Sequence, residues 1–173
     1  MPFNRERAPV DMDVDLGSSI ESIKSLTMSN DSIDVYVDAS TIAGAGAGLF
    51  AKRRLRAGED VRGATYGGDV LSLSETLKMS SSDKEYVMAM HVNVHVDAKK
   101  RLGYLARFVN DVVGTANERN AIFMKDVARR RATLRALRDV EAGEELFAAY
   151  GDGYWRARGV DVNQVDAKTA RRE

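Results

Sequence analysis

The sequence predicts one domain built mainly of β-strands with short helices. Three observations support this fold class: alternating apolar residues near the start, two similar strand-turn phrases that end at Tyr66 and Tyr150, and glycine-rich turns between short apolar runs. With 173 residues, 44% of them hydrophobic, the chain is long enough for one core and too short for two comfortable ones. We expect a flexible polar tail at residues 1–31, the domain at 32–155 and a second polar tail at 156–173.

The composition excludes several classes of function. The 26 basic and 26 acidic residues cancel, so the whole chain has no field that would attract nucleic acid or a membrane surface. The absence of Cys excludes disulfides, cysteine nucleophiles and thiolate zinc sites. No apolar run has the length of a signal peptide or of a membrane-spanning helix, which needs about 20 residues. We therefore expect a soluble intracellular protein, and the oligomeric state stays open.

The first elements in chain order are a tail and a strand. The tail has only a weak helical spacing, at Ile20, Ile23 and Leu26. Residues 33–37 then alternate in the manner of a half-buried strand, so the domain is expected to begin there.

Residues 43–48 place a glycine at every second position, which lets another group approach the backbone closely. A phosphate loop is a weak alternative, because neither GxGxxG nor GK[ST] is present.

A repeated sequence motif lies on both sides of the middle of the chain. Residues 55–61 predict a turn that enters a strand, and the same phrase returns at 140–146, each copy being followed by a Tyr-Gly pair. Two copies are too few for a solenoid, so we expect two similar strand-turn units in one small β fold. Residues 74–90 carry the clearest helical pattern, with Ser74 as a candidate N-cap and a break at 80–83 that can cap a second short helix.

Two histidines and an arginine-rich run need separate interpretation. Residues 92–96 alternate as a strand that places His91, Asn93 and His95 on one polar face. We favour an exposed face over a metal site, since a closed site needs more ligands. Residues 129–138 alternate arginine with Ala and Leu, which favours a strand with a solvated face over a helix. Recognition of an acidic partner, either nucleic acid or an acidic protein patch, is the weaker alternative.

Residues 103–155 contain the features that best indicate a site. A polar cluster at 107–111 is flanked by aromatic residues, and a second segment ends on Tyr150 among glycines and further aromatics. Buried strands seldom need such residues.

Three motifs together resemble the SET-domain protein lysine methyltransferases: GAGAGLFAKRRLRAGEDV with TYGGDV, then ARFVND with NAIF, then LRALRDVEAGEELFAAYGDGYW. The resemblance covers about residues 33–155, and the closing YGDGYW is similar to the histone H3 lysine-9 branch. It implies the SET β-clip fold, in which the C-terminal segment passes through a loop as a pseudoknot, a rare arrangement elsewhere.

The resemblance implies a site for S-adenosylmethionine. The residues that match cofactor contacts of the family are Gly46, Ala47, Gly48, Tyr86, Arg107, Phe108, Asn110, Asp111 and Tyr154. This chain departs from the family at Asp111, where the RFxNH motif has histidine, and at Ala47, where a large aromatic is common. The cysteine-rich zinc module that follows the domain in many relatives is absent, and no metal is expected.

The resemblance also implies a lysine channel. Tyr150 matches the catalytic tyrosine and Tyr66 a second tyrosine that lines the channel, while Tyr154 closes it. Ala148 and Met88 stand where aromatics limit the number of methyl groups, so we expect room for di- or trimethylation. A free lysine amine is the nucleophile, and an apolar channel beside a sulfonium lowers its pKa from about 10.4.

The implied function is therefore S-adenosylmethionine-dependent protein lysine N-methylation. A histone tail is the substrate that the resemblance suggests, together with a place in the nucleus or on chromatin. The alternative is a catalytically inactive SET-like β-clip that binds proteins. We expect no membrane partner and no direct binding of nucleic acid.

Overall fold

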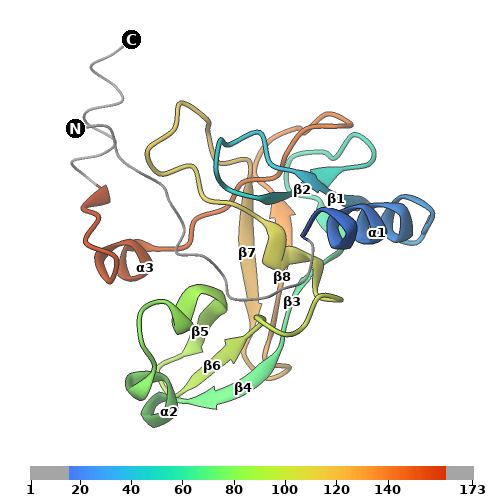
Figure 1. Ribbon diagram of the computed structural model, residues 1–173. Helices are drawn as coiled ribbons and strands as arrows, with labels where there is room; N and C mark the ends of the chain where they lie inside the picture. The colour runs from blue at the N-terminus through green and yellow to red at the C-terminus, as the bar shows by residue number, and fades with distance from the viewer. Residues whose placement is uncertain (1–15, 163–173) are drawn as a thin grey trace.

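Antiparallel strand pairs organise the part of the chain that the computed structural model describes, residues 16–162 (Figure 1). The first sheet pairs β1 (Val35–Ala39) with β2 (Ala47–Ala51). The second has the order β3 (Asp60–Tyr66), β8 (Arg131–Ala136), β7 (Ala121–Asp126). The third has the order β4 (Asp69–Ser72), β6 (Val94–Asp97), β5 (Val87–His91). The helices are α1 (Leu16–Met28), α2 (Leu73–Lys78), α3 (Asp152–Arg156) and the 3-10 turns η1 (Asp83–Tyr86) and η2 (Leu105–Phe108). The predicted fold class, mainly β with short helices, is confirmed.

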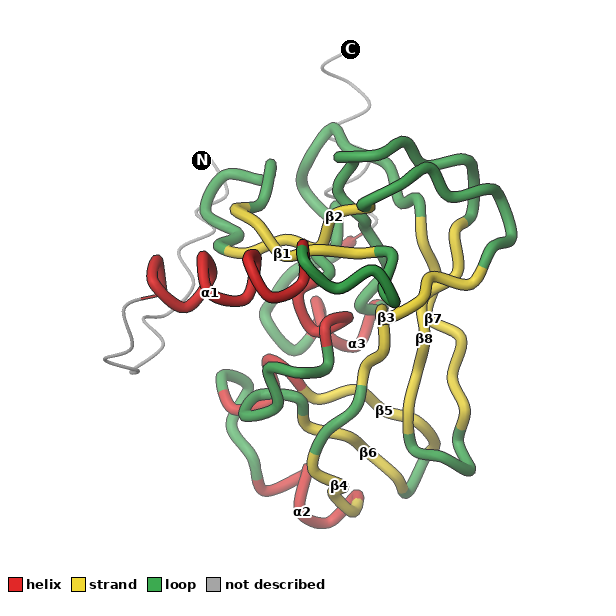
Figure 2. Tube along the Cα trace, turned by 90° about the vertical axis from the view of Figure 1, so that its right-hand side faces the viewer, coloured by secondary structure: helices red, strands yellow, loops and turns green. Residues whose placement is uncertain are grey.

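The core follows from the alternation along the strands. In β8, the side chains of Ala132, Leu134 and Ala136 are buried, while those of the intervening residues face outward. The predicted strand at 129–138 is therefore confirmed, and Arg135 on its outer face pairs with Asp60 at 2.7 Å. Figures 1 and 2 show the first and third sheets at opposite ends of the long β7–β8 hairpin, with α3 between these ends.

The repeated phrase forms two similar turns that face each other. Leu55 and Val140 pair as an antiparallel bridge, with N–H to O distances of 2.9 and 3.0 Å. Gly58 and Gly143 occupy the two turns with φ of 81° and 84°, a region that favours glycine. The glutamate after each glycine accepts a hydrogen bond from the backbone N–H three residues earlier, at 2.9 and 3.0 Å. The two strand-turn units are thus built alike and stabilise each other.

The helix α1 packs on the domain, which corrects the expected boundary at residue 32. Ile23 packs against the core, and the hydroxyl of Thr27, a residue only 4% exposed, accepts a hydrogen bond from the N–H of Val37 at 3.4 Å. Lys24 forms an ion pair with Asp38 at 2.7 Å. Weak helical spacing in the sequence did not reveal this docking, because it depends on contacts with β1. Residues 1–15 and 163–173 of the predicted tails lie outside the described residues.

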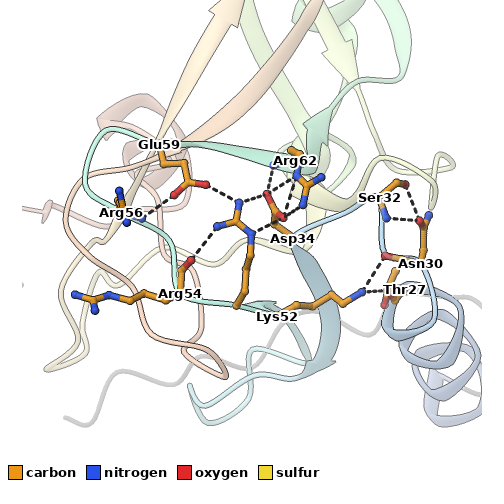
Figure 3. Close-up of polar contacts among 10 residues, drawn as sticks. Thr27, Asn30, Ser32, Asp34, Lys52, Arg54, Arg56, Glu59 and Arg62 are labelled. Carbon is orange, nitrogen blue, oxygen red and sulfur yellow. Dashed lines mark hydrogen bonds and ion pairs between the residues drawn. The ribbon is translucent and has the colours of Figure 1, made fainter.

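A buried carboxylate fastens the start of β1 to its neighbours (Figure 3). Asp34 is 1% exposed and accepts hydrogen bonds from the guanidinium groups of Arg53 at 2.8 Å and Arg62 at 2.7 Å. Burial alone would raise the pKa of this carboxyl, but the bonds from Arg62 and Arg53 outweigh it and hold the pKa well below its usual range. Arg53 also binds Glu59 at 2.5 Å, so the ion pair extends to the first glycine turn.

The segment between the two repeats differs from the prediction in detail. Ser72, not Ser74, caps α2: its hydroxyl accepts from the N–H of Glu75, whose carboxylate binds back to the N–H of Ser72. The expected single strand at 92–96 is a hairpin instead, since the chain turns at Val92 and Asn93 between β5 and β6. Valines occupy both the turn and the second strand, so alternation alone could not separate them.

The C-terminal segment passes between the two ends of one loop. The N–H of Ala148 donates to the carbonyl of Asn110 at 3.0 Å, and the N–H of Ala121 donates to the carbonyl of Phe147 at 3.0 Å. Asn110 and Ala121 flank the loop 111–120, so residues 147–148 are held from both sides, as the expected pseudoknot requires. These residues form isolated bridges in place of the regular strand that was predicted. The chain stays packed beyond the expected boundary at 155, because Val160 is only 8% exposed.

Candidate active site

A cavity of about 1080 Å³ gathers most of the predicted site residues. Those that line it are Gly46, Ala47, Tyr66, Tyr86, Met88, Arg107, Phe108, Asn110, Tyr150 and Tyr154. Gly48, Asp111 and Ala148 are not among the lining residues. The fold thus brings the glycine segment, the η2 cluster and the C-terminal aromatics to one place, although they are far apart in the sequence.

Arg107 forms one wall of the cavity. Its guanidinium carbon lies 4.3 Å from the ring centre of Tyr86 and 4.9 Å from that of Phe108. One terminal nitrogen donates to the carbonyl of Lys99 at 3.1 Å, while Nε is buried without a hydrogen-bond partner among the described residues. Buried donors are almost always paired in proteins, so this nitrogen indicates a place for an acceptor from a ligand.

A second buried carboxylate, that of Glu145, organises the glycine segment beside the cavity. Glu145 is 3% exposed and accepts hydrogen bonds from the hydroxyl of Ser40 at 2.7 Å and from the N–H of Thr41 at 2.7 Å. The amide nitrogen of Asn110 lies 3.2 Å from the same carboxylate and donates to the carbonyl of Ala47 at 3.0 Å. Glu145 and Asn110 together fix the glycine segment in position.

The two glycines of the predicted Gly-x-Gly segment have different environments. A Cβ atom on Gly48 would overlap the carboxyl group of Glu145, so this glycine allows the carboxylate to approach the backbone. Gly46 lines the cavity with φ of 75°, and no atom lies within 4 Å of the position where its Cβ would be. Close approach of a ligand is therefore possible at Gly46, whereas Gly48 serves the fold.

Tyr66 is a buried phenol at the end of β3. It is 6% exposed, its hydroxyl donates to the carbonyl of Tyr86, and its ring meets Phe123 edge-on at 5.8 Å. Burial raises the pKa of Tyr66, and the carboxylate of Asp97 raises it further. The hydroxyl therefore stays protonated at neutral pH and cannot act as a base there.

The C-terminal aromatics form a stack around Tyr150. The ring of Tyr150 meets Tyr154 edge-on at 4.7 Å and lies nearly parallel to Trp155 at 6.1 Å. Its hydroxyl donates to the carbonyl of Val109 at 2.8 Å. The guanidinium carbon of Arg158 lies 3.6 Å from the centre of the Tyr154 ring. This packing positions Tyr150 against the polar cluster of η2.

Asp111 is placed differently from the expectation that it binds cofactor. It is 2% exposed, and one carboxylate oxygen accepts hydrogen bonds from the backbone N–H of Tyr150 at 2.9 Å and from Nε1 of Trp155 at 2.8 Å. The other oxygen accepts from the N–H of Val112 at 2.8 Å and from Nε of Arg119 at 3.1 Å. The aspartate is thus directed to the aromatic stack, and it is not among the residues that line the cavity.

The two residues expected to set the width of the channel have different environments. Ala148 is fully buried in the core, where its N–H binds Asn110, and it does not line the cavity. Met88 does line the cavity, and the ring of Phe123 contributes to the same wall as Tyr66.

The two histidines do not share a strand face. His91 ends β5, whereas His95 lies in β6 and lines the cavity with Nδ1 buried and unpartnered among the described residues. Burial lowers the pKa of His95, and the charge of Lys84 lowers it further. Within residues 16–162, no three His, Asp or Glu side chains gather as a metal site.

Sequence reasoning missed the contributions of Glu145, Trp155 and Phe123. Glu145 is the second of two adjacent glutamates before an apolar run, and nothing in that pattern distinguishes a buried carboxylate from a solvated one. Trp155 is the sole tryptophan of the chain, which gave a weak signal of a special role. Phe123 lies in the NAIF motif, but only the fold places it against Tyr66.

Comparison with known families now identifies the fold. The SET-domain family model matches residues 46–151, more than half of the chain. The chain belongs to the SET-domain family. SET domains are generally protein lysine methyltransferases that use S-adenosylmethionine and act on protein substrates. No curated protein matches the chain. None of the helices within residues 16–162 is long and apolar enough to span a membrane.

Proposed function

We propose that this SET-domain protein is an S-adenosylmethionine-dependent protein lysine N-methyltransferase. The observation that supports it most is the meeting of three tyrosines, Tyr66, Tyr150 and Tyr154, with Arg107 and Asn110 around one cavity. The family match alone would allow an inactive relative. Retention of these groups in one place favours a working site.

The residues present fit the proposed cofactor. Gly46 leaves its backbone open to a ligand, and the unpartnered Nε of Arg107 offers a buried donor to a carboxylate or another acceptor. The rings of Tyr86 and Phe108, which contact Arg107, provide an apolar surface beside it. S-adenosylmethionine would supply a methyl group on a positively charged sulfur.

In the proposed reaction, the protein aligns the lysine amine with the methyl group and supplies a preorganised electrostatic field, and it needs no strong base. Tyr150 is proposed to orient the amine through its hydroxyl, which the stack with Tyr154 and Trp155 holds in place. The protonated hydroxyl of Tyr66 and the ring of Tyr154 form polar and aromatic walls that suit a cationic, methylated nitrogen. Cationic side chains that line the cavity, such as Lys84, disfavour the ammonium form of the incoming lysine.

Two finer features of the function are part of the proposal. The similarity of residues 150–155 to the H3 lysine-9 branch suggests a histone tail as one candidate substrate, and the charge of the cavity lining bears on whether so basic a segment is accepted. Transfer of more than one methyl group is proposed from Met88, which lines the cavity, and from the small side chain of Ala148, both of which stand where aromatics are common in the family.

Calorimetric titration of the full chain with S-adenosylmethionine tests the proposal against the inactive binding module. We expect saturable one-to-one binding that is weakened by Arg107→Ala. An absence of binding would favour a β-clip that only recognises proteins and would overturn the proposed activity.

A further inference from the structure

The charge of the cavity lining differs from the charge of the whole chain. The protein has 26 basic and 26 acidic residues, yet the described residues that line the cavity include seven Lys or Arg and one carboxylate, that of Glu85. Such a local surplus is invisible in the composition. It acts directly on whatever enters the cavity.

Two of the seven cations are paired with acids. Lys99 lies 3.7 Å from Asp83, and Arg119 lies 3.1 Å from Asp111. The charge of these two is largely compensated, so they contribute little to the field in the cavity.

The other five have no carboxylate within ion-pair distance among the described residues. They are Lys84, Lys100, Arg107, Lys125 and Arg158. Three of them, the two arginines and Lys125, donate to backbone carbonyls, which do not cancel their positive charge. Arg107 is the donor proposed for the cofactor, so the other four remain for a substrate. Lys100 and Lys125 are exposed, so they can meet a ligand that approaches from solvent.

Two strand edges show which kind of ligand the cavity can receive. β5 and β7 are the last strands of their sheets, and Ala89 of β5 and Ile122 of β7 both line the cavity. Nζ of Lys125 donates to the carbonyl of Ala89 at 2.7 Å, so the two strands approach each other there. Strand edges offer backbone donors and acceptors to an extended polypeptide, a recognition mode that nucleic acid does not use.

We infer that the cavity takes a target lysine from a protein segment whose neighbouring residues are acidic. This inference rests on the proposed methyltransferase function and specifies its substrate class. Unpaired cations attract a segment rich in Asp and Glu and repel one rich in Lys and Arg, such as a histone tail. Because these side chains are partly exposed, salt weakens their attraction for the substrate, with a screening length of about 10 Å at 0.1 M ionic strength.

Binding of two matched peptides to the full chain tests the inference. Each carries one lysine and the same apolar residues, with Glu and Asp on both sides in one peptide and Arg in the other. Fluorescence anisotropy in 50 mM salt should show the acidic peptide binding about tenfold more tightly or better, with the difference shrinking in 500 mM salt. Equal affinities, or tighter binding of the basic peptide, would overturn the inference.

Charge reversal at single exposed lysines locates the effect. Lys100→Glu and Lys125→Glu should each weaken binding of the acidic peptide severalfold and leave the basic peptide unweakened. Lys78→Glu is the matched control, since Lys78 is exposed at the end of α2 and does not line the cavity. An equal loss in all three variants would show that general charge, and not this cavity, governs binding.

Two further arms separate the inference from its alternatives. A labelled single-stranded oligonucleotide that binds more tightly than the acidic peptide, and weakens in the same two variants, would assign the surface to nucleic acid and refute the inference. Methyl transfer is scored separately. An acidic peptide that binds without being methylated supports the charge preference of the cavity and counts against the proposed activity. Preferred methylation of the basic peptide supports the activity and overturns the charge preference.

Discussion

Replacement of Asp111 should loosen the aromatic stack that holds Tyr150. In Asp111→Ala, the backbone N–H of Tyr150 and Nε1 of Trp155 lose their common acceptor, which lies 2.9 and 2.8 Å away in the wild type. A buried donor left without a partner costs about 1–3 kcal/mol, so the two together cost about 2–6 kcal/mol. Arg119 is 40% exposed and can turn to water, so its loss adds little.

Urea unfolding of the Asp111→Ala and Trp155→Phe variants and of the double mutant measures this effect. Trp155→Phe keeps an aromatic ring beside Tyr150 but removes the indole N–H together with part of the ring, and the double-mutant cycle separates the coupling with Asp111 from the lost packing. We expect a coupling energy of about 1–2 kcal/mol between the two positions. Methyl transfer by Asp111→Ala should fall mainly in kcat, since the carboxylate does not line the cavity. A loss of stability below 0.5 kcal/mol, or zero coupling, would refute the bridging role.

The remaining predictions concern catalysis, product and acid stability. Tyr150→Phe should abolish most methyl transfer while S-adenosylmethionine still binds; normal turnover would remove Tyr150 from the reaction. Met88→Phe should shift products toward monomethyl-lysine by mass spectrometry, and exclusive monomethylation by the wild type would already contradict a roomy channel. The fold lowers the pKa of Asp34, so its carboxylate should stabilise the protein fully at a pH above about 3.9, the pKa of Asp in an unfolded chain. This contribution should be lost as the pH falls toward the pKa of Asp34 in the folded protein. Unfolding experiments on Asp34→Asn should show a weaker acid dependence below pH 4; an unchanged profile would count against the ion pair with Arg53 and Arg62.

The sequence predicted the elements whose pattern is local. Alternation identified β1 and the arginine-bearing β8, and the repeated glycine phrase identified two turns of the same construction. Most of the site residues that the family resemblance indicated also line the cavity. These features depend on side-chain period and on turn chemistry, which can be read along the chain.

Features that depend on distant partners could not be predicted. The partners of Asp111 lie 39 and 44 residues away at Tyr150 and Trp155, so the sequence could not show that its carboxylate faces them. Likewise, only the fold shows that Ala148 is fully buried and that its N–H donates to the carbonyl of Asn110, 38 residues earlier. The docking of α1 likewise depends on contacts with β1.

The charge of the cavity lining also depends on residues that are distant in the sequence, so the sequence alone could not show it. Its cations come from η1, from η2 and the segments on both sides of it, from β7 and from the C-terminal segment, and only the fold gathers them. The arginine run at 129–138 lies on the outer face of β8 and in the residues beside it, as predicted for a solvated strand face, and its arginines do not line the cavity.

Transfer of labelled methyl groups from S-adenosylmethionine to proteins tests the central claim most directly. The full chain is incubated with core histones and, separately, with an acidic protein mixture, beside the Tyr150→Phe variant. We expect label on lysine that depends on Tyr150, with more label in the acidic mixture than in the histones. No label above the variant in either mixture, together with no calorimetric binding of S-adenosylmethionine, would contradict a methyltransferase.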